Sequence, residues 1–240
     1  AELERLAGLF IEKGYKEADI NMGCPVPLMI AGKHKGAGML LYPAQVAEVL
    51  APIAEYPEIQ FSLKMRLGWE NASECMVLVE LLNTLRLSRI ALHARTGKQQ
   101  YKGHPDLEAF QGFYELCQHP LYYNGGIESL SDIRQILTRF PLLKGVFIGR
   151  GLLSSPLLAK EFKGNETFLP EQRMSIYFAF HEELFSAYSQ VLQGETQLLV
   201  KMKTLWEYFL PETDRKLLKR IKKSTRLQQY TESVKAIFTS

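Results

Sequence analysis

Short apolar runs alternate with amphipathic segments along the first two thirds of the chain. The apolar runs have the length and aliphatic content of buried strands, and polar or turn-forming residues bound each of them. The segments between them carry apolar residues at helical spacing, and several begin with Pro or Ser, as helix starts prefer. Strands that alternate with helices in this way predict a parallel sheet. We expect strands at 18–21, 59–65, 90–93, 121–124 and 145–148.

The spacing of these strands is that of an α/β barrel, although spacing alone also allows an open, doubly wound sheet. A closed barrel needs eight strands, whereas the pattern gives five, and the chain opens in helix-forming sequence. We therefore expect a TIM (β/α)8-type barrel lacking its first strands, with about strands 4 to 8 in residues 1–163. Helices are expected between the strands at 43–55, 72–85, 105–117, 129–140 and 151–162.

The strand pattern stops after residue 163, and only helical patterns follow it. A change from alternating elements to helices alone indicates a new domain. We expect residues 164–240 to form a C-terminal all-α domain. Its helices are predicted at 170–192, 196–210, 212–223 and 228–238.

Composition places the chain among soluble globular proteins. Of its 240 residues, 46% are hydrophobic and 23% charged, and no apolar run approaches the roughly 20 residues that span a bilayer. The first residues lack the pattern of an export signal, and Cys24, Cys75 and Cys117 suit neither a disulfide framework nor the short spacings of a zinc site. The histidines form no metal-ligand motif either. We expect a cytoplasmic protein without a membrane span or a metal.

The small net charge of +3 conceals a basic C-terminal region. Residues 196–240 hold 10 Lys and Arg against 4 Asp and Glu. Such a balance suggests a polyanionic partner, with a solvated helix face as the alternative. The basic residues concentrate on one amphipathic helix, at Arg215, Lys216, Lys219, Arg220, Lys222, Lys223 and Arg226.

Polar side chains gather where the predicted strands end, which is where such barrels place catalytic groups. The strand ends are Asn21-Met22-Gly23-Cys24-Pro25, Lys64-Met65-Arg66, His93-Ala94-Arg95-Thr96, Asn124-Gly125-Gly126 and Gly149-Arg150-Gly151. The glycine motifs close the last two strands, where barrels often bind phosphate, so they predict a mononucleotide site; ordinary turns are the alternative. Lys64 and Arg66 should point to one side, where an anionic ligand or a barrel carboxylate would neutralise them.

Cys24 follows a strand and opens a long glycine-rich loop, which we expect to act as a lid. A lone cysteine is usually a small buried hydrophobic residue. A thiol that is mostly protonated at neutral pH also suits a general acid that delivers a proton beside a hydride donor. Cys75 and Cys117 fall on helical faces and are expected in the core.

From about residue 16 to about residue 160, these motifs resemble those of the tRNA-dihydrouridine synthase family, in the same order. The loop around Cys24 with Gly36-Ala37-Gly38 is similar to the family's active-site loop, and Lys64-Met65-Arg66-Leu67-Gly68 to its lysine-arginine strand. His93-Ala94-Arg95-Thr96 with Gln99 and Tyr101 resembles its substrate loop. The Asn-Gly-Gly and Ile-Gly-Arg-Gly motifs also occur in other flavin barrels, whereas these loops do not.

The resemblance implies FMN in the barrel, NADPH as its reductant, and tRNA as the substrate. Hydride would pass to C6 of a uracil and Cys24 would protonate C5. By the same resemblance Lys64 would contact the isoalloxazine ring. The flavin phosphate and ribityl chain would be held by His93, Asn124, Gly125, Gly126, Gly149 and Arg150. The base would be contacted by Asn21, Arg66, Arg95 and Tyr101.

The resemblance also leaves alternatives open. The family's opening strand, with a flavin-binding Pro-Met-x-Gly-Val segment, has no counterpart here, so we expect the chain to begin part-way through a longer gene product. The C-terminal domain resembles the family's tRNA-binding domain in position and character only, and no obligate protein partner is inferred. The competing hypotheses are another FMN barrel oxidoreductase acting on a free pyrimidine, and an inactive RNA-binding remnant.

Overall fold

The computed structural model describes residues 2–26 and 34–239. By its internal contacts the chain divides into two compact units. The first comprises Ala1–Ile127 with Ser131–Ile148, and the second Glu128–Leu130 with Gly149–Ser240. The contacts therefore place the start of the second unit near Gly149, and the domain boundary expected after residue 163 stays a prediction. No helix in the described part of the chain is long and apolar enough to cross a membrane.

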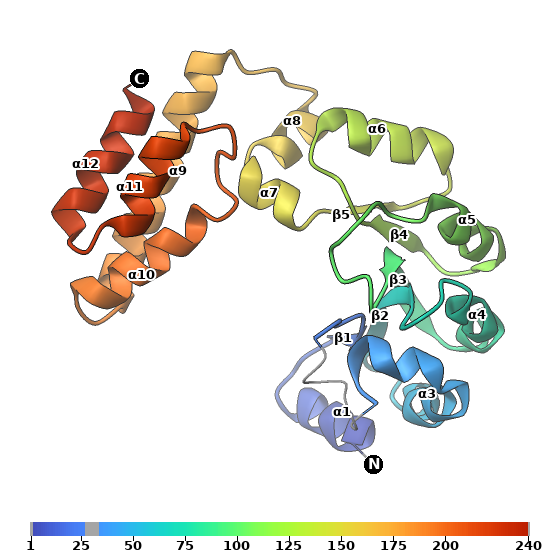
Figure 1. The fold of residues 1–240 in the computed structure, drawn as a ribbon. Coiled ribbons are helices and arrows are strands. Elements are labelled where there is room, and N and C mark those ends of the chain that lie inside the picture. Colours follow the sequence, from blue (N-terminus) through green and yellow to red (C-terminus); the bar gives the residue numbers. More distant parts are fainter. Residues whose placement is uncertain (1, 27–33, 240) are drawn as a thin grey trace. The chain divides into compact units, whose positions relative to one another are not determined.

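The first unit is built on one parallel sheet of five strands, in the order β1-β2-β3-β4-β5 (Figure 1). All five predicted strands are confirmed. Because the order follows the sequence without a reversal, these strands do not form the doubly wound arrangement, whose order reverses at a switch point. The strands are β1 (Glu17–Met22), β2 (Gln60–Gly68), β3 (Leu87–Thr96), β4 (Leu121–Asn124) and β5 (Gly145–Phe147).

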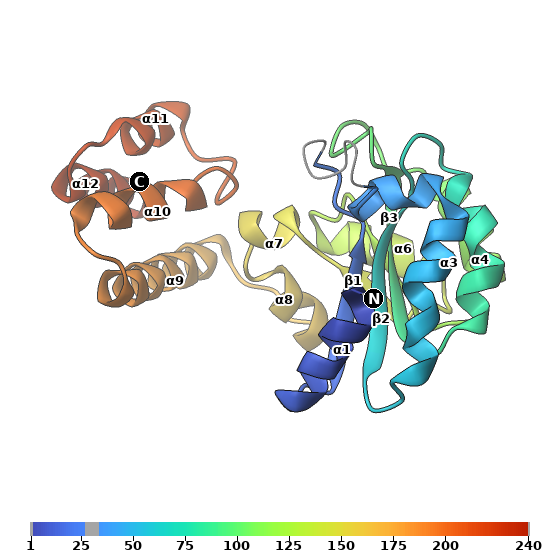
Figure 2. The same ribbon diagram turned by 90° about the horizontal axis from the view of Figure 1, so that it is seen from below.

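Helices that follow the strands pack beside one another along the sheet (Figures 1 and 2). Parallel neighbours need such crossovers, and covering the sheet with helices buries long apolar runs such as that of β2. Phe61, Leu63, Met65 and Leu67 are all fully buried there. The helical elements of this part are α1 (Glu2–Glu12), η1 (Gly36–Leu41), α3 (Pro43–Leu50), η2 (Ala51–Glu55), α4 (Glu74–Thr84), α5 (Leu107–Leu116) and α6 (Leu130–Arg139).

Two of the predicted helices change their course near a proline. The helix expected at 43–55 is α-helical only to Leu50 and continues as the 3-10 segment η2, which contains Pro52. The helix expected at 151–162 is two helices, α7 (Arg150–Ser154) and α8 (Leu158–Gly164), with Pro156 between them. Proline lacks the N–H that an α-helix needs and disfavours helical backbone at the preceding residue. The range predicted at 43–55 is therefore confirmed as helical, with a change of helix type at Ala51. The prediction of one continuous helix at 151–162 was wrong, because it passed over Pro156.

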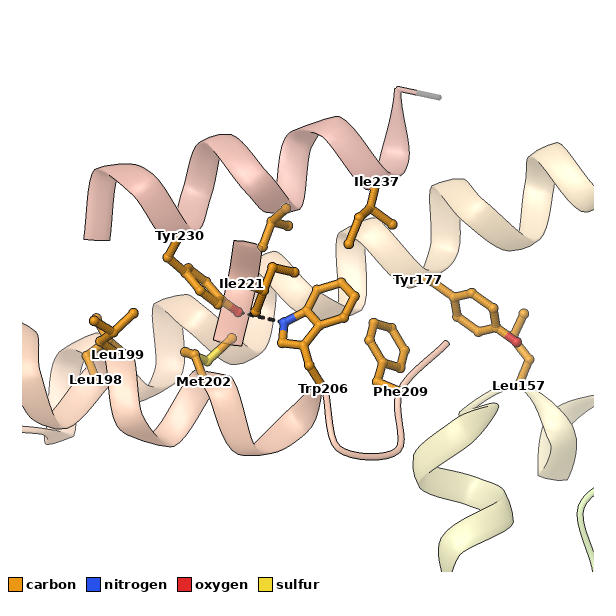
Figure 3. Packing of buried hydrophobic residues seen from close by; sticks show 11 residues of the cluster. Leu157, Tyr177, Leu198, Leu199, Met202, Trp206, Phe209, Ile221, Tyr230 and Ile237 are labelled. Atoms are coloured by element: carbon orange, nitrogen blue, oxygen red, sulfur yellow. Dashed lines mark hydrogen bonds between the residues drawn. The ribbon is translucent and has the colours of Figure 1, made fainter. Parts of the chain in front are cut away.

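Four longer helices of the second unit pack around an apolar core (Figure 3). They are α9 (Pro170–Val191), α10 (Glu195–Leu205), α11 (Arg215–Lys223) and α12 (Leu227–Phe238), close to the predicted ranges. Trp206 lies near the centre, with its ring 5.4 Å from that of Phe209 in an edge-to-face arrangement. The buried members of the core are Leu157, Tyr177, Leu198, Leu199, Met202, Trp206, Phe209, Ile221, Tyr230, Val234 and Ile237.

A chain of hydrogen bonds crosses this apolar core. The indole N–H of Trp206 donates to the Tyr230 hydroxyl at 3.0 Å, as Figure 3 shows. That hydroxyl is 2.7 Å from Nε2 of His181, whose Nδ1 is 3.1 Å from the Glu182 carboxylate. The carboxylate only accepts, so Nδ1 carries the proton; Nε2 of the neutral ring then accepts from Tyr230. Every member of the chain is thus satisfied when His181 is neutral.

We expect His181 to make the protein less stable in mild acid. Burial lowers the pKa of His181, and Glu182 partly offsets this. The unfolded chain therefore binds the proton first, near its ordinary pKa of about 6.5. The free energy of unfolding should fall as the pH drops from there toward the folded pKa, and should not depend on this group at higher pH. Urea unfolding at a series of pH values measures this, and His181→Gln should show a smaller acid-side loss; an equal loss in both proteins would contradict the assignment.

Candidate active site

The sheet brings the predicted site residues to one edge. Arg66, His93 and Asn124 are direct register partners on β2, β3 and β4. Asn21 and Lys64 are partners on β1 and β2. Because the strands are parallel, their carboxyl ends meet, as the sequence pattern required. The first unit thus gathers side chains from four consecutive strands.

Cys24 is held by hydrogen bonds on both sides of its backbone. The side-chain oxygen of Asn21 accepts from the backbone N–H groups of Gly23 at 2.9 Å and Cys24 at 3.1 Å. The carbonyl of Cys24 accepts from the N–H of Ala37 at 3.0 Å. Gly36 has a φ of +57°, and a Cβ added there would lie 2.8 Å from that carbonyl, so only glycine suits the position. Most of the expected lid, at 27–33, lies outside the described residues.

His93 and Arg95 form a buried pair at the end of β3. Their residues are 6% and 4% exposed. One guanidinium nitrogen of Arg95 lies 3.1 Å from Nε2 of His93, and another donates to the carbonyl of Gly103 at 2.9 Å. Since a guanidinium can only donate, Nε2 of His93 accepts, which makes the imidazole neutral with its proton on Nδ1. The ring of Tyr101 lies 6.3 Å from that of His93.

Lys64 lies in a cluster of like charges. Its pKa is lowered to about 8, mainly by burial and also by nearby Arg66, while Asp19 acts in the opposite direction. Asp19 itself accepts a hydrogen bond from the Ser62 hydroxyl at 2.6 Å. Burial is the main cause that lowers the pKa of Arg66, and nearby Arg95 lowers it as well, while Tyr101 acts in the opposite direction. A cluster of half-buried and buried cations of this kind suits an anionic ligand such as a phosphate.

The turn after β4 has a backbone that glycine alone adopts easily. Gly125 and Gly126 have φ angles of +132° and +62°. A Cβ on Gly125 would lie 3.1 Å from the His93 ring, and one on Gly126 would lie 3.0 Å from Pro105. Successive backbone N–H groups in such turns are common anion-binding elements. Asn124 anchors the turn, because its side-chain N–H donates to the carbonyl of Phe147 at 2.7 Å.

The sequence model of the dihydrouridine synthase family matches residues 1–239, which is nearly the whole chain. The chain belongs to the dihydrouridine synthase family. The resemblance drawn from the strand-end motifs is thereby confirmed.

Curated relatives agree with this membership. A probable tRNA-dihydrouridine synthase of Rhizobium leguminosarum bv. phaseoli is 31% identical over 157 residues, 65% of this chain and 48% of that protein. One of Aquifex aeolicus is 35% identical over 60% of this chain and 46% of that protein. The tRNA-dihydrouridine synthase B of Vibrio vulnificus is 27% identical over 67% of this chain and 51% of that protein. The chain spans about half the length of the curated relatives it matches.

The expected roles of four further site residues in this family member stay predictions. Gly149 and Arg150 belong to the second unit, so they stay a prediction as phosphate ligands. Arg66 is only 1% exposed, although it was expected to contact the base. Tyr101, with the same expectation, is 55% exposed.

Several residues that shape the site carry no motif. Gly97 fits against Trp69 so closely that an added Cβ would lie 2.0 Å from the indole ring. Gln100 has a backbone φ of +52°, which residues other than glycine rarely adopt. Its carbonyl accepts a hydrogen bond from Arg66 at 2.7 Å. Sequence analysis missed the Gln100 contact because every residue has a backbone carbonyl, so none is marked as an acceptor. It missed the close fit of Gly97 and Trp69 because the two residues are far apart in sequence. The only signal was glycine at positions 97 and 103, within the loop that resembles the family's substrate loop.

Proposed function

We propose that this protein is a tRNA-dihydrouridine synthase that reduces a uridine of tRNA to 5,6-dihydrouridine. The observation that carries the proposal is the family match over residues 1–239. The arrangement of Cys24 beside the cation cluster supports it. The five parallel strands would then be part of a (β/α)8-type barrel, and the second unit a helical tRNA-binding domain.

FMN is the cofactor that the site suits. Lys64 would lie against the isoalloxazine ring, and His93, Asn124, Gly125, Gly126, Gly149 and Arg150 would hold the ribityl phosphate. Bound reduced FMN would supply the hydride that C6 of uracil accepts, with NADPH as the source of electrons. The glycine turn has no Cβ atoms, so the ligand could approach its backbone closely. The Nδ1–H of neutral His93 could donate to the ligand.

Cys24 would be the proton donor. Reduction of the C5=C6 double bond requires one hydride at C6 and one proton at C5. The thiol, held by Asn21 and Ala37 through its backbone, would give its proton to C5 and regain one from solvent. Donors fixed in this way are most effective because they need no reorganisation during the reaction.

The uracil would be held by groups around Cys24. The target base must leave the folded tRNA, which costs a few kcal/mol of stacking, and an exposed ring can offset part of that cost. Tyr101 supplies such a ring, in the loop that follows β3. Asn21 would add an amide N–H, because its oxygen is engaged by the Cys24 loop.

Helix α11 is the expected contact for tRNA phosphates. It begins at a capping Asp214, whose carboxylate accepts from the N–H groups of Lys216 and Leu217, and it buries Ile221. Its basic side chains are exposed on the opposite side, four of them along a groove with α12. Phosphates would displace solvent ions from such a surface. The groove residues are Lys216, Lys219, Arg220, Lys223, Ser224, Gln229, Glu232 and Ser233.

Neutralising three lysines of this groove should weaken tRNA binding. The variant Lys216→Gln, Lys219→Gln and Lys223→Gln removes three exposed charges. Each lost phosphate contact should make the dependence of log K on log salt concentration shallower by about 1, so the expected change is about 3. Fluorescence anisotropy of labelled tRNA at several salt concentrations measures both the affinity and the slope.

A control variant separates local contacts from overall charge. Lys13→Gln, Lys16→Gln and Lys144→Gln remove the same charge from exposed positions of the first unit. These changes should leave the salt dependence nearly as it is. An equal effect of both variants would show that α11 makes no specific contribution.

The activity itself is tested with dihydrouridine-free tRNA, FMN and NADPH. Dihydrouridine in the digested tRNA supports the proposal. Reduction of free uracil or uridine without any tRNA binding would instead favour an FMN oxidoreductase for small pyrimidines.

A further inference from the structure

Arg66 lies at the end of β2, between the two loops that carry the proposed chemistry. Its side chain is almost completely buried. Nε donates to the carbonyl of Gly23, next to Cys24, at 2.9 Å. Nη1 donates to two carbonyls of the other loop, those of Thr96 at 2.9 Å and Gln100 at 2.7 Å. One guanidinium group thus joins the Cys24 loop to the loop of residues 96–101.

Hydrogen bonds to backbone carbonyls stabilise the charged guanidinium of Arg66. Within the described ranges 2–26 and 34–239, no carboxylate forms an ion pair with it. A buried cation without a carboxylate is costly unless hydrogen bonds satisfy it, and bonds from a charged donor are about twice as strong as neutral ones. The guanidinium is planar and rigid, so the three carbonyls that it contacts are fixed relative to one another. This geometry favours a structural task over contact with a ligand.

The loop of residues 96–101 adapts to Arg66 in two ways. Gln100 adopts the left-handed backbone that turns its carbonyl toward the guanidinium. Such a conformation costs about 1 kcal/mol or more in a residue other than glycine, and persists only where the surroundings compensate it. Tyr101, the next residue, lies with its ring centre 5.4 Å from the Arg66 guanidinium carbon. Arg66 therefore fixes both the backbone of this loop and its aromatic side chain.

We propose that Arg66 is a positioning residue that sets the placement of the Cys24 thiol relative to the base held at Tyr101. This inference rests on the proposed function, and it replaces the direct contact with the base that the family resemblance implied for Arg66. Lysine at this position keeps the charge but has a single ammonium group on a flexible stem, so it cannot hold the carbonyls of both loops in one plane.

The variant Arg66→Lys tests, in the full-length protein, whether Arg66 holds the two loops together. Amide hydrogen exchange should become faster at Cys24 and in residues 97–101 together, because both loops lose the same anchor. The kcat for tRNA reduction should fall about 100-fold, since a misplacement of about 1 Å has that effect. The affinity for FMN should change little, because the groups proposed to hold it are unchanged. KM for tRNA should also change little, because most of the binding energy comes from phosphate contacts outside these two loops.

Lys98→Gln is the matched control. Lys98 lies in the same loop, and its exposed side chain forms an ion pair only with Glu70 among the described residues. This change should alter neither amide exchange at Cys24 nor kcat. If Arg66→Lys does not fold, Arg66→Gln gives the same comparison without a charge to bury.

Three outcomes overturn the proposal. Unchanged amide hydrogen exchange in both loops would show that Arg66 does not hold them together. Faster exchange in one loop alone would show that they are not coupled. A fall in kcat with unchanged exchange would mean that Arg66 acts on the substrate directly. The exchange data decide these points even if the wild-type protein makes no dihydrouridine, which would instead contradict the proposed function.

Discussion

Replacing Cys24 by alanine should nearly abolish reduction of tRNA while leaving the flavin site intact. The thiol is the proposed proton donor, and a positioned general acid contributes about 100- to 10,000-fold to a rate. The backbone of Cys24 makes the hydrogen bonds that shape its loop, so alanine keeps them. Single-turnover reduction of tRNA by the pre-reduced protein measures the loss directly, and flavin absorbance measures cofactor binding and reduction by NADPH.

Cys117→Ala serves as the control for loss of a thiol. Cys117 follows α5, near the start of β4 and away from Asn124, and burial raises its pKa. This variant should reduce tRNA at the wild-type rate. Loss of FMN binding in Cys24→Ala would contradict the assigned role, because it would make Cys24 part of the flavin site rather than the proton donor.

Trp206→Ala should destabilise the helical core by about 3–5 kcal/mol. The side chain is almost fully buried, at 2% exposed, and its loss leaves a cavity among the rings of Phe209 and Phe238. The Tyr230 hydroxyl also loses the N–H that donates to it. Urea unfolding followed by far-ultraviolet circular dichroism measures the change, because most of the second unit is helical.

Trp206→Phe separates the two contributions. Phenylalanine fills most of the space but cannot donate to Tyr230. The free energy of unfolding should therefore fall by about 1 kcal/mol for the lost hydrogen bond, and by a smaller amount for the lost packing. Trp69 remains in both variants as a fluorescent reporter of the first unit, and its signal in the native state should not change. A loss below about 1 kcal/mol in Trp206→Ala would show that the core collapses around the site or contributes little.

The strands and most helices could be predicted from sequence because their signals are local. Apolar runs bounded by polar or turn-forming residues marked all five strands. The observed β2 and β3 are longer than predicted, extending to Gly68 and Thr96, because pairing between neighbouring strands carries them past the apolar run. The break at Pro156 was not predicted, although proline often ends a helix, because the helical spacing of apolar residues continues on both sides of it.

The site was predictable as a set of residues but not as a set of contacts. The motifs placed Cys24, Lys64 and His93 at strand ends, and the sheet brings these strand ends to one edge. The carbonyls that hold Arg66 and Arg95 have no sequence signature. The chain of His181, Tyr230 and Trp206 joins residues far apart in sequence, so no local pattern predicts it.

The most direct test of the central claim is mass analysis of nucleosides from tRNA. Dihydrouridine-free tRNA would be incubated with the full-length protein, FMN and NADPH, digested, and compared with a reaction that contains Cys24→Ala. We expect dihydrouridine from the wild-type protein, at one or a few positions, and almost none from the variant. Absence of dihydrouridine with the wild-type protein, in a reaction where the flavin is bound and reduced, would contradict the account.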